Sequence, residues 1–255
     1  MSKASVSRQR AREQLAQERA RAARRRRRRW LAGGGGAAAV IAAAVALWLA
    51  VAGGGGGAAA PPLRLAALST LGTLRPAPAP GPAGPEGVPV PGAAALAGTG
   101  MKATGQAVDG IGCSTSEQTL FHIHAHLSVF VNGSARQVPA GIGIPGARAI
   151  ATARGPFVSS GTCFYWLHTH AADGIIHIES PVHRAYTLGE FFDEWRQPLG
   201  PGQVGPERGH VTALYNGRVY RGNPRDIPLA AHAQIQLEVG APLVAPVAIT
   251  WPAGL

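Results

Sequence analysis

The chain has 255 residues and a formal net charge of +11, with 35 glycines, 21 prolines, nine histidines and two cysteines. Residues 1–29 contain 12 lysines or arginines and two acidic residues, whereas the other 226 residues contain 12 basic and 11 acidic side chains. A nucleic-acid-binding globular domain is therefore disfavoured, because no basic surface remains outside the tail to neutralise phosphates, and two cysteines exclude a multi-cysteine zinc or iron–sulfur scaffold.

An uncharged stretch at residues 31–52 follows a run of six arginines at residues 24–29. At about 1.5 Å per residue, this stretch is long enough to cross a hydrocarbon core of about 30 Å. Because positive charge stays on the cytoplasmic side, we expect a cytoplasmic basic tail over 1–30, a single transmembrane helix (a signal-anchor) over 31–52 and an extracytoplasmic remainder. We also expect the arginine-rich tail to contact anionic lipid headgroups of the cell membrane.

Two other interpretations of this region stay open. The span can be a cleaved signal peptide, because residues 58–60 are small enough for processing, and the rest of the chain would then be secreted. The arginine run can instead be a nucleic-acid patch or a localisation signal. Because the arginine run lies next to the uncharged span in the sequence, a role in membrane topology is favoured.

Residues 53–100 consist mainly of glycine, alanine and proline. Repeated proline favours an extended, polyproline-like backbone and removes the N–H donors that a strand would need. The composition therefore predicts a semi-rigid spacer over 53–100, which holds one exported domain over 101–255 away from the membrane.

Strand patterns dominate residues 101–255. Residues 120–131 alternate, and Asn132-Gly133 is typical of a type I′ hairpin turn that leads into a second arm over 136–144. A second Asn-Gly turn occurs at residues 216–217. We expect further strands at residues 164–170, 175–179, 210–215, 219–221 and 233–239.

A single helix is expected after Thr187. Thr187 and Glu190 form a capping box, and four apolar residues follow at helical spacing: Leu188, Phe191, Phe192 and Trp195. The acidic residues of this helix, Glu194 among them, are expected on its solvated face. These patterns predict an α+β fold, in which a mainly antiparallel sheet packs against one helix. The order of the last elements is similar to the second half of a β-grasp domain.

Cys113 and Cys163 both lie in the part of the chain that we expect to be exported, where disulfides persist. A bond between them would close a loop of about 50 residues and stabilise the fold by roughly 4 kcal/mol in the chain-entropy model. Two free thiols, or a cysteine that binds a metal, are the alternatives. We favour the disulfide.

All nine histidines lie in the predicted domain, and three of them share one face of a predicted strand. Within residues 121–131 the odd positions are apolar, and the even positions include His122, His124 and His126. Because side chains alternate along a strand, one face would pack on a core and the other would carry three imidazoles.

A second histidine cluster spans a predicted hairpin. His168 and His170 share one face of the first arm, and His177 and Glu179 share a face of the second. If residues 171–174 close the hairpin symmetrically, His168 lies directly opposite His177. Opposed β-carbons are about 5 Å apart, so these two imidazoles can share one metal ion.

These clusters favour a divalent transition-metal site. Imidazole ligands on strands, with no methionine nearby and the cysteines paired, suit Zn²⁺, Cu²⁺ or Fe²⁺. We predict His168, His170 and His177 as ligands, with further ligands or supporting groups at His122, His124, His126 and Glu179. Three histidines with one open position can also activate a bound water for hydrolysis or hydration, so whether the protein is an enzyme stays open. The alternative is a non-catalytic cell-envelope module with a structural or pH-sensing His/Glu network.

Four segments resemble a family of exported or membrane-anchored bacterial proteins without a known activity: FHIHAHLSVFVNG, YWLHTHAADGIIHIESP, TLGEFFDEW and ALYNG. The resemblance covers roughly residues 101–240, and the HTH and GIIHIES segments are its most specific part. It implies a location in the cell envelope and nothing about a reaction.

Overall fold

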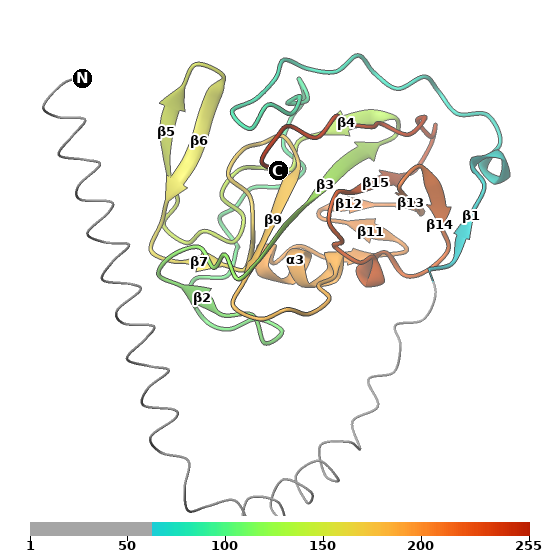
Figure 1. The fold of residues 1–255 in the computed structure, drawn as a ribbon. Coiled ribbons are helices and arrows are strands. Elements are labelled where there is room, and N and C mark those ends of the chain that lie inside the picture. Colours follow the sequence, from blue (N-terminus) through green and yellow to red (C-terminus); the bar gives the residue numbers. More distant parts are fainter. Residues whose placement is uncertain (1–62) are drawn as a thin grey trace, which may run out of the picture. The chain divides into compact units, whose positions relative to one another are not determined.

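The structure, a computed structural model, describes residues 63–255. The predicted basic tail, the predicted transmembrane helix and the first part of the spacer lie outside the described residues. Within 63–255 the fold is α+β, as predicted: a mixed, mainly antiparallel sheet accompanies the single α-helix of this region (Figure 1). No helix among these residues is long and apolar enough to cross a membrane.

A central sheet of eight strands forms the framework. Its strands are β1 (Leu65–Ala66), β3 (Phe121–Val131), β4 (Ser134–Arg136), β8 (Leu167–His168), β9 (Ile175–Ser180), β13 (Val211–Tyr215), β14 (Arg218–Tyr220) and β15 (Ala233–Val239). They follow the order β1-β14-β13-β15-β3-β9-β8, and β4 pairs with the far end of β3. Strands β3 and β15 pair in parallel, and β3 pairs antiparallel with β9. The long strand β3 therefore lies between β15 and β9.

Smaller elements surround this sheet in the described region. A three-stranded sheet joins β10 (Leu199–Gly200), β11 (Gln203–Val204) and β12 (Glu207–Arg208), and two short 3-10 helices are η1 (Leu68–Leu71) and η2 (Pro224–Asp226). Strands β5 (Arg148–Thr152) and β6 (Gly155–Ser160) form a hairpin that the sequence patterns did not indicate. Most side chains of this hairpin are exposed, so its strands lack the apolar face that marks a core strand.

The turn after β3 matches the prediction, but the strand that follows is shorter. Asn132 and Gly133 have φ angles of 49° and 75°, which a type I′ turn requires. The second arm ends at the close of β4 instead of continuing to residue 144. The chain then turns through Gly143 at a φ of 69°, where an added β-carbon would lie 2.2 Å from the carbonyl oxygen of Leu167. Because of this close approach, the position requires glycine, which has no β-carbon, and the strand does not continue through it.

The predicted strand at 164–170 is split in two. Its first part is β7 (Phe164–Tyr165), which pairs with β2 (Cys113–Ser114), and its second part is β8, which pairs with β9. The predicted register between β8 and β9 is confirmed, because His168 is the direct partner of His177.

The core lies between the helix α3 (Leu188–Trp195) and the face of the sheet that carries the odd residues of β3. The capping box of Thr187 and Glu190 is present, and Phe191, Phe192 and Trp195 are fully buried. The predicted solvated position of Glu194 is wrong, because its side chain is 0% exposed. The segment around Ala103 contacts the helix at this residue, where the N–H of Ala103 donates to the main-chain carbonyl of Glu194.

Residues 63–100 lie against the domain, whereas their composition predicted a spacer. Strand β1 pairs with β14, and Val88 and Leu96 are 0% and 4% exposed. Several N–H groups of this segment donate to carbonyls, such as that of Leu96, which donates to the carbonyl of Gln137 at 2.9 Å. Scattered apolar side chains therefore fix this segment, which forms one compact unit with the rest of the described chain.

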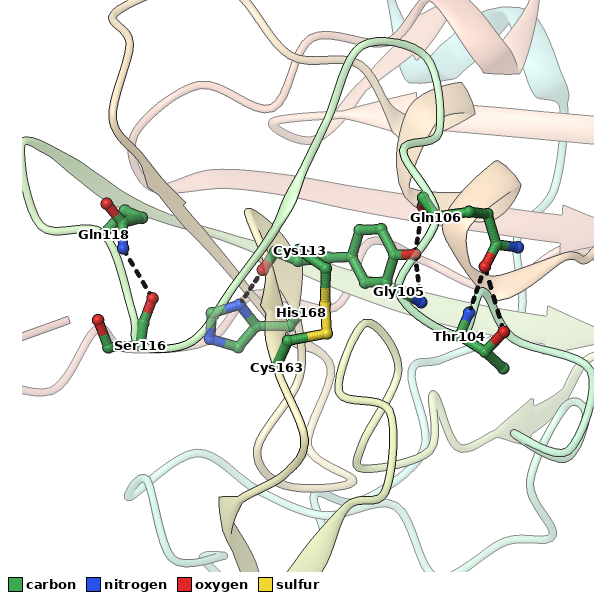
Figure 2. The surroundings of a disulfide bond; sticks show 9 residues. Thr104, Gly105, Gln106, Cys113, Ser116, Gln118, Cys163 and His168 are labelled. Atoms are coloured by element: carbon green, nitrogen blue, oxygen red, sulfur yellow. Dashed lines mark hydrogen bonds between the residues drawn. A yellow bond between two sulfur atoms is a disulfide. The ribbon is translucent and has the colours of Figure 1, made fainter.

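The predicted disulfide between Cys113 and Cys163 is present (Figure 2). It joins β2 to the residue that precedes β7, so the two strands are both paired and covalently linked. Strand β7, which follows Cys163, also contacts His168, because the Nδ1 of His168 donates to the carbonyl of Tyr165 (Figure 2). The disulfide thus stabilises the backbone that positions the second histidine cluster.

Candidate metal centre

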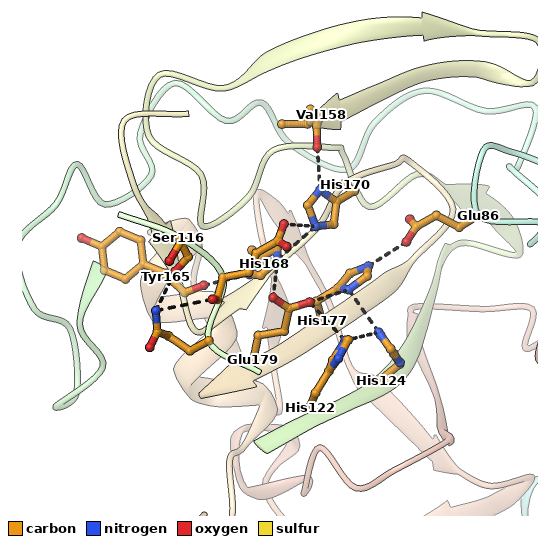
Figure 3. A network of polar contacts seen from close by, with 12 residues as sticks. Glu86, Ser116, His122, His124, Val158, Tyr165, His168, His170, His177 and Glu179 are labelled. Atoms are coloured by element: carbon orange, nitrogen blue, oxygen red, sulfur yellow. Dashed lines mark hydrogen bonds and ion pairs between the residues drawn. The ribbon is translucent and has the colours of Figure 1, made fainter. Parts of the chain in front are cut away.

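Three neighbouring strands bring most of the predicted ligand residues together. Strand β3 lies beside β9 in the sheet, and on the side opposite the core His122 pairs with Glu179 and His124 pairs with His177. Strand β8 adds His168 on the other side of β9. Figure 3 shows these side chains converging around His177 and Glu179. The predicted residues that the structure brings into groups able to hold a metal are His122, His124, His168, His170, His177 and Glu179.

Four donor atoms form a closed arrangement, which we term the first group: His122 Nε2, His124 Nε2, His177 Nδ1 and Glu179 Oε1. His124 Nε2 lies 3.1 Å from both His122 Nε2 and His177 Nδ1. Glu179 Oε1 lies 3.1 Å from His122 Nε2 and 3.4 Å from His177 Nδ1. Ligand atoms arranged tetrahedrally around a zinc ion are about 3.3 Å apart, given bonds of about 2.0 Å. These four distances are close to this value, and all ligand atoms of the first group lie within 4.8 Å of one another.

His168 and His170 present their Nε2 atoms to each other at 3.1 Å. The Nδ1 of His168 donates to the carbonyl of Tyr165 at 2.8 Å, and the Nδ1 of His170 donates to the carbonyl of Val158 at 2.5 Å. Because a carbonyl only accepts, each Nδ1 carries the proton, and in the neutral imidazole Nε2 carries a lone pair. Two lone pairs that face each other repel, and a shared cation would remove this repulsion.

Two carboxylates stand beside this histidine pair. Glu117 Oε1 lies 3.5 Å from His170 Nε2, and Glu179 Oε2 lies 4.0 Å from His168 Nε2. Glu179 Oε2 is buried and has no hydrogen-bond partner among the described residues. The predicted ligands His168, His170 and His177 form one group that could hold a metal, with ligand atoms within 4.8 Å of one another. Because His177 also belongs to the first group, we term His168, His170 and Glu117 the second group. The carboxylate of Glu179 lies between the first group and the second.

Glu86 is a site residue that sequence reasoning missed. Its Oε1 accepts a hydrogen bond from His177 Nε2 at 2.6 Å, which leaves Nδ1 of this ring to face the first group. A carboxylate in this position orients a metal-binding histidine and raises its basicity. Glu86 lies in the proline-rich segment, and Glu117 lies in a loop before β3, so neither belongs to a strand pattern that could have indicated it.

Burial keeps three of these imidazoles neutral. It is the largest cause that lowers the pKa of His124 to about 3, with the neighbouring His177 and His122 adding to the effect. Burial also lowers the pKa of His168 well below its ordinary value, and it lowers the pKa of His170. A neutral imidazole is the form that binds a metal, so no proton has to leave these rings first.

His177 differs from these three because carboxylates surround it. Burial disfavours its charged form, but the hydrogen bonds with Glu179 and Glu86 outweigh burial and raise the pKa of His177 to about 9. Without a metal, the ring is therefore a cation at neutral pH. A metal ion in the first group would take the place of the proton on Nδ1.

His126 is the predicted ligand that the structure places apart. Its Nε2 donates to the carbonyl of Asp173 at 3.0 Å, and it belongs to none of the groups among residues 63–255 that could hold a metal. Its partner on β9 is Ile175, the first residue of that strand, so no ligand-type side chain lies opposite. His126 instead lines a cavity of about 630 Å³ between β3 and the proline-rich segment.

The two groups together offer imidazole nitrogens and carboxylate oxygens, mostly buried, with His122 and Glu117 exposed at the edge. Such a donor set can bind a divalent metal, and the exposed members provide a route from solvent. A comparison of the chain with protein-family models, curated proteins and solved structures finds no match.

Proposed function

We propose that the domain binds a divalent transition-metal ion (Zn, Cu or Fe) through its strand-borne His/Glu cluster. The observation that carries the proposal is the first group, in which four donor atoms from β3 and β9 form a ring whose neighbouring members are 3.1–3.4 Å apart. Direct pairing of His122 with Glu179 and of His124 with His177 fixes this spacing, because backbone hydrogen bonds hold both strands in register.

Hydrogen bonds between the proposed histidine ligands and other groups support the same function. Glu86 orients His177, and main-chain carbonyls orient His168 and His170, so that one ring nitrogen of each points into the cluster. Fixed orientation of this kind lowers the entropy lost on metal binding. No free cysteine is present among the described residues, which favours ions that accept nitrogen and oxygen ligands.

We further propose a location outside the cytoplasm, with residues 31–52 as the membrane anchor and the basic tail on anionic lipid headgroups. The Cys113–Cys163 disulfide supports an oxidising compartment. The sequence resemblance to exported proteins supports the same location.

A structural His/Glu network is the second candidate function. It is favoured by His177, which lies between Glu86 and Glu179 and forms ion pairs with both when it is protonated. In this case the cluster would stabilise the sheet, and its protonation would respond to pH.

Elemental analysis separates the two candidates. Residues 63–255 are exported to an oxidising compartment, purified without chelator and compared with His177→Ala and with the exposed control His210→Ala. Metal binding predicts a stoichiometric metal in the unaltered domain and in the control, with a clear loss in His177→Ala. A domain without metal, and without uptake of added Zn²⁺ or Cu²⁺, would contradict metal binding and favour the structural network.

A further inference from the structure

The cluster holds more donor atoms than one metal ion can use. The first group alone supplies four, which is the number of ligands that a structural zinc site holds. His168 and His170 remain, with their Nε2 lone pairs 3.1 Å apart, and Glu117 Oε1 lies 3.5 Å from the second of these rings. These three residues come from other segments than the first group, namely β8, the turn that follows it and the loop before β3.

The carboxylate of Glu179 faces both groups with different oxygens. Its Oε1 contacts His122 and His177 of the first group. Its Oε2 is the atom nearer His168, and this buried oxygen has no hydrogen-bond donor among the described residues. A carboxylate that presents one oxygen to each side can bridge two ions about 3.5–4 Å apart.

The negative charge around the cluster also supports binding of more than one metal ion. Glu86, Glu117 and Glu179 surround the histidines, and every ion pair that the described residues form with these carboxylates involves a histidine and no lysine or arginine. Several carboxylates placed together without a cationic side chain are stabilised when metal ions supply the positive charge.

We infer that the cluster is a dinuclear metal centre, an inference that rests on the proposed function. One ion occupies the first group, and a second ion is bound by His168, His170 and Glu117. The carboxylate of Glu179 bridges the two ions. Each ion then has three ligands of its own and shares Glu179 with the other.

Titration with Cu²⁺ tests this inference. Residues 63–255, stripped with a chelator, are titrated, the bound copper is counted, and electron paramagnetic resonance is recorded. We expect two equivalents of copper and a spectrum of two interacting spins with a half-field transition. The variant Glu117→Gln should weaken only the second equivalent, by at least about 10-fold. Its side chain is 42% exposed, so the fold should tolerate the change, and Glu207→Gln is the matched control.

The possible outcomes are distinct. Two equivalents with interacting spins, and a single weakened equivalent in Glu117→Gln, support the dinuclear centre. One equivalent with the spectrum of an isolated spin overturns the dinuclear centre and leaves the proposed function intact. Two equivalents with isolated spectra also overturn it, because the ions would then not share Glu179. No bound copper overturns both proposals.

Discussion

His177 Nε2 lies 2.6 Å from Glu86 Oε1, although 91 positions separate the two residues in the chain. The contact places a proline-rich segment, which looks like a spacer in the sequence, directly at the candidate metal centre. It also sets the orientation of the imidazole that pairs with both His124 and His168 across the sheet. The integrity of the centre should therefore depend on residues far outside the histidine strands.

Replacement of Glu86 tests this dependence. In Glu86→Gln the carboxylate that orients His177 is lost while every proposed ligand remains. We expect metal affinity to fall about 10–100-fold, which is the usual effect when the hydrogen-bond partner of a metal-binding histidine is removed. Competition with a chromogenic chelator measures the change, and Glu207→Gln serves as control. An unchanged affinity would show that Glu86 does not support the centre.

Removal of residues 63–100 should weaken the fold as well as the centre. This segment supplies β1 and the buried side chains of Val88 and Leu96. Each side chain of this type contributes about 1.5–3 kcal/mol when it is buried. Urea unfolding should therefore show a lower free energy of unfolding for residues 101–255 than for residues 63–255. Equal values would mean that the segment contributes nothing to stability.

Loss of the disulfide should lower stability through the unfolded chain, which gains conformational entropy without the bond. The bond closes a loop between residues separated by 50 positions. The chain-entropy model gives about 4 kcal/mol for a loop of this size. In urea unfolding, the free energy of unfolding of the variant Cys113→Ser/Cys163→Ser should be lower by about this much. A reductant should lower the free energy of unfolding of the unaltered protein and leave that of the variant unchanged. A variant as stable as the unaltered protein would contradict the prediction.

Glu194 should make stability depend on pH. Its carboxyl is fully buried, and burial is the largest cause that raises the pKa of Glu194 well above its ordinary value. The folded state therefore holds this proton more tightly than the unfolded state, whose glutamate titrates near pH 4.3. Stability from this group is complete below that pH and decreases as the pH rises towards the folded pKa, by at most about 1.4 kcal/mol per pH unit.

The variant Glu194→Gln removes this titration. Its stability relative to the unaltered protein should rise between pH 5 and pH 7, which urea unfolding at several pH values measures. A constant difference between the two proteins over this range would show that Glu194 does not titrate as described.

Replacement of His126 should leave metal binding intact. His126→Ala removes a ring that contacts the carbonyl of Asp173 and lines the cavity, whereas His124→Ala removes a donor of the first group. Elemental analysis should show normal metal content in the first variant and a reduced content in the second. Equal losses in both variants would place His126 in the centre.

Alternation and turn chemistry made much of the centre predictable. The period of two in β3 separated the core side chains from the histidines, and the symmetric turn before β9 placed His168 opposite His177. The capping box of Thr187 and Glu190 located the helix. These signals are local, because they depend on residues a few positions apart.

The remaining features depend on long-range packing. Glu86 and Glu117 reach the histidines from irregular segments, and no periodic pattern marks such positions. Glu194 is fully buried, and a segment distant in the chain contacts the helix at this residue through the N–H of Ala103. His126 leaves the cluster because β9 begins opposite it, a boundary that alternation along β3 cannot reveal.

Anomalous diffraction is the most direct test of metal binding at the cluster. Crystals of residues 63–255 grown with Zn²⁺ would be measured on both sides of the zinc absorption edge. We expect a zinc-specific peak about 2.0–2.1 Å from His124 Nε2 and His177 Nδ1. A map without a peak in the cluster, or with peaks only at exposed histidines such as His210 and His232, would contradict metal binding at the cluster.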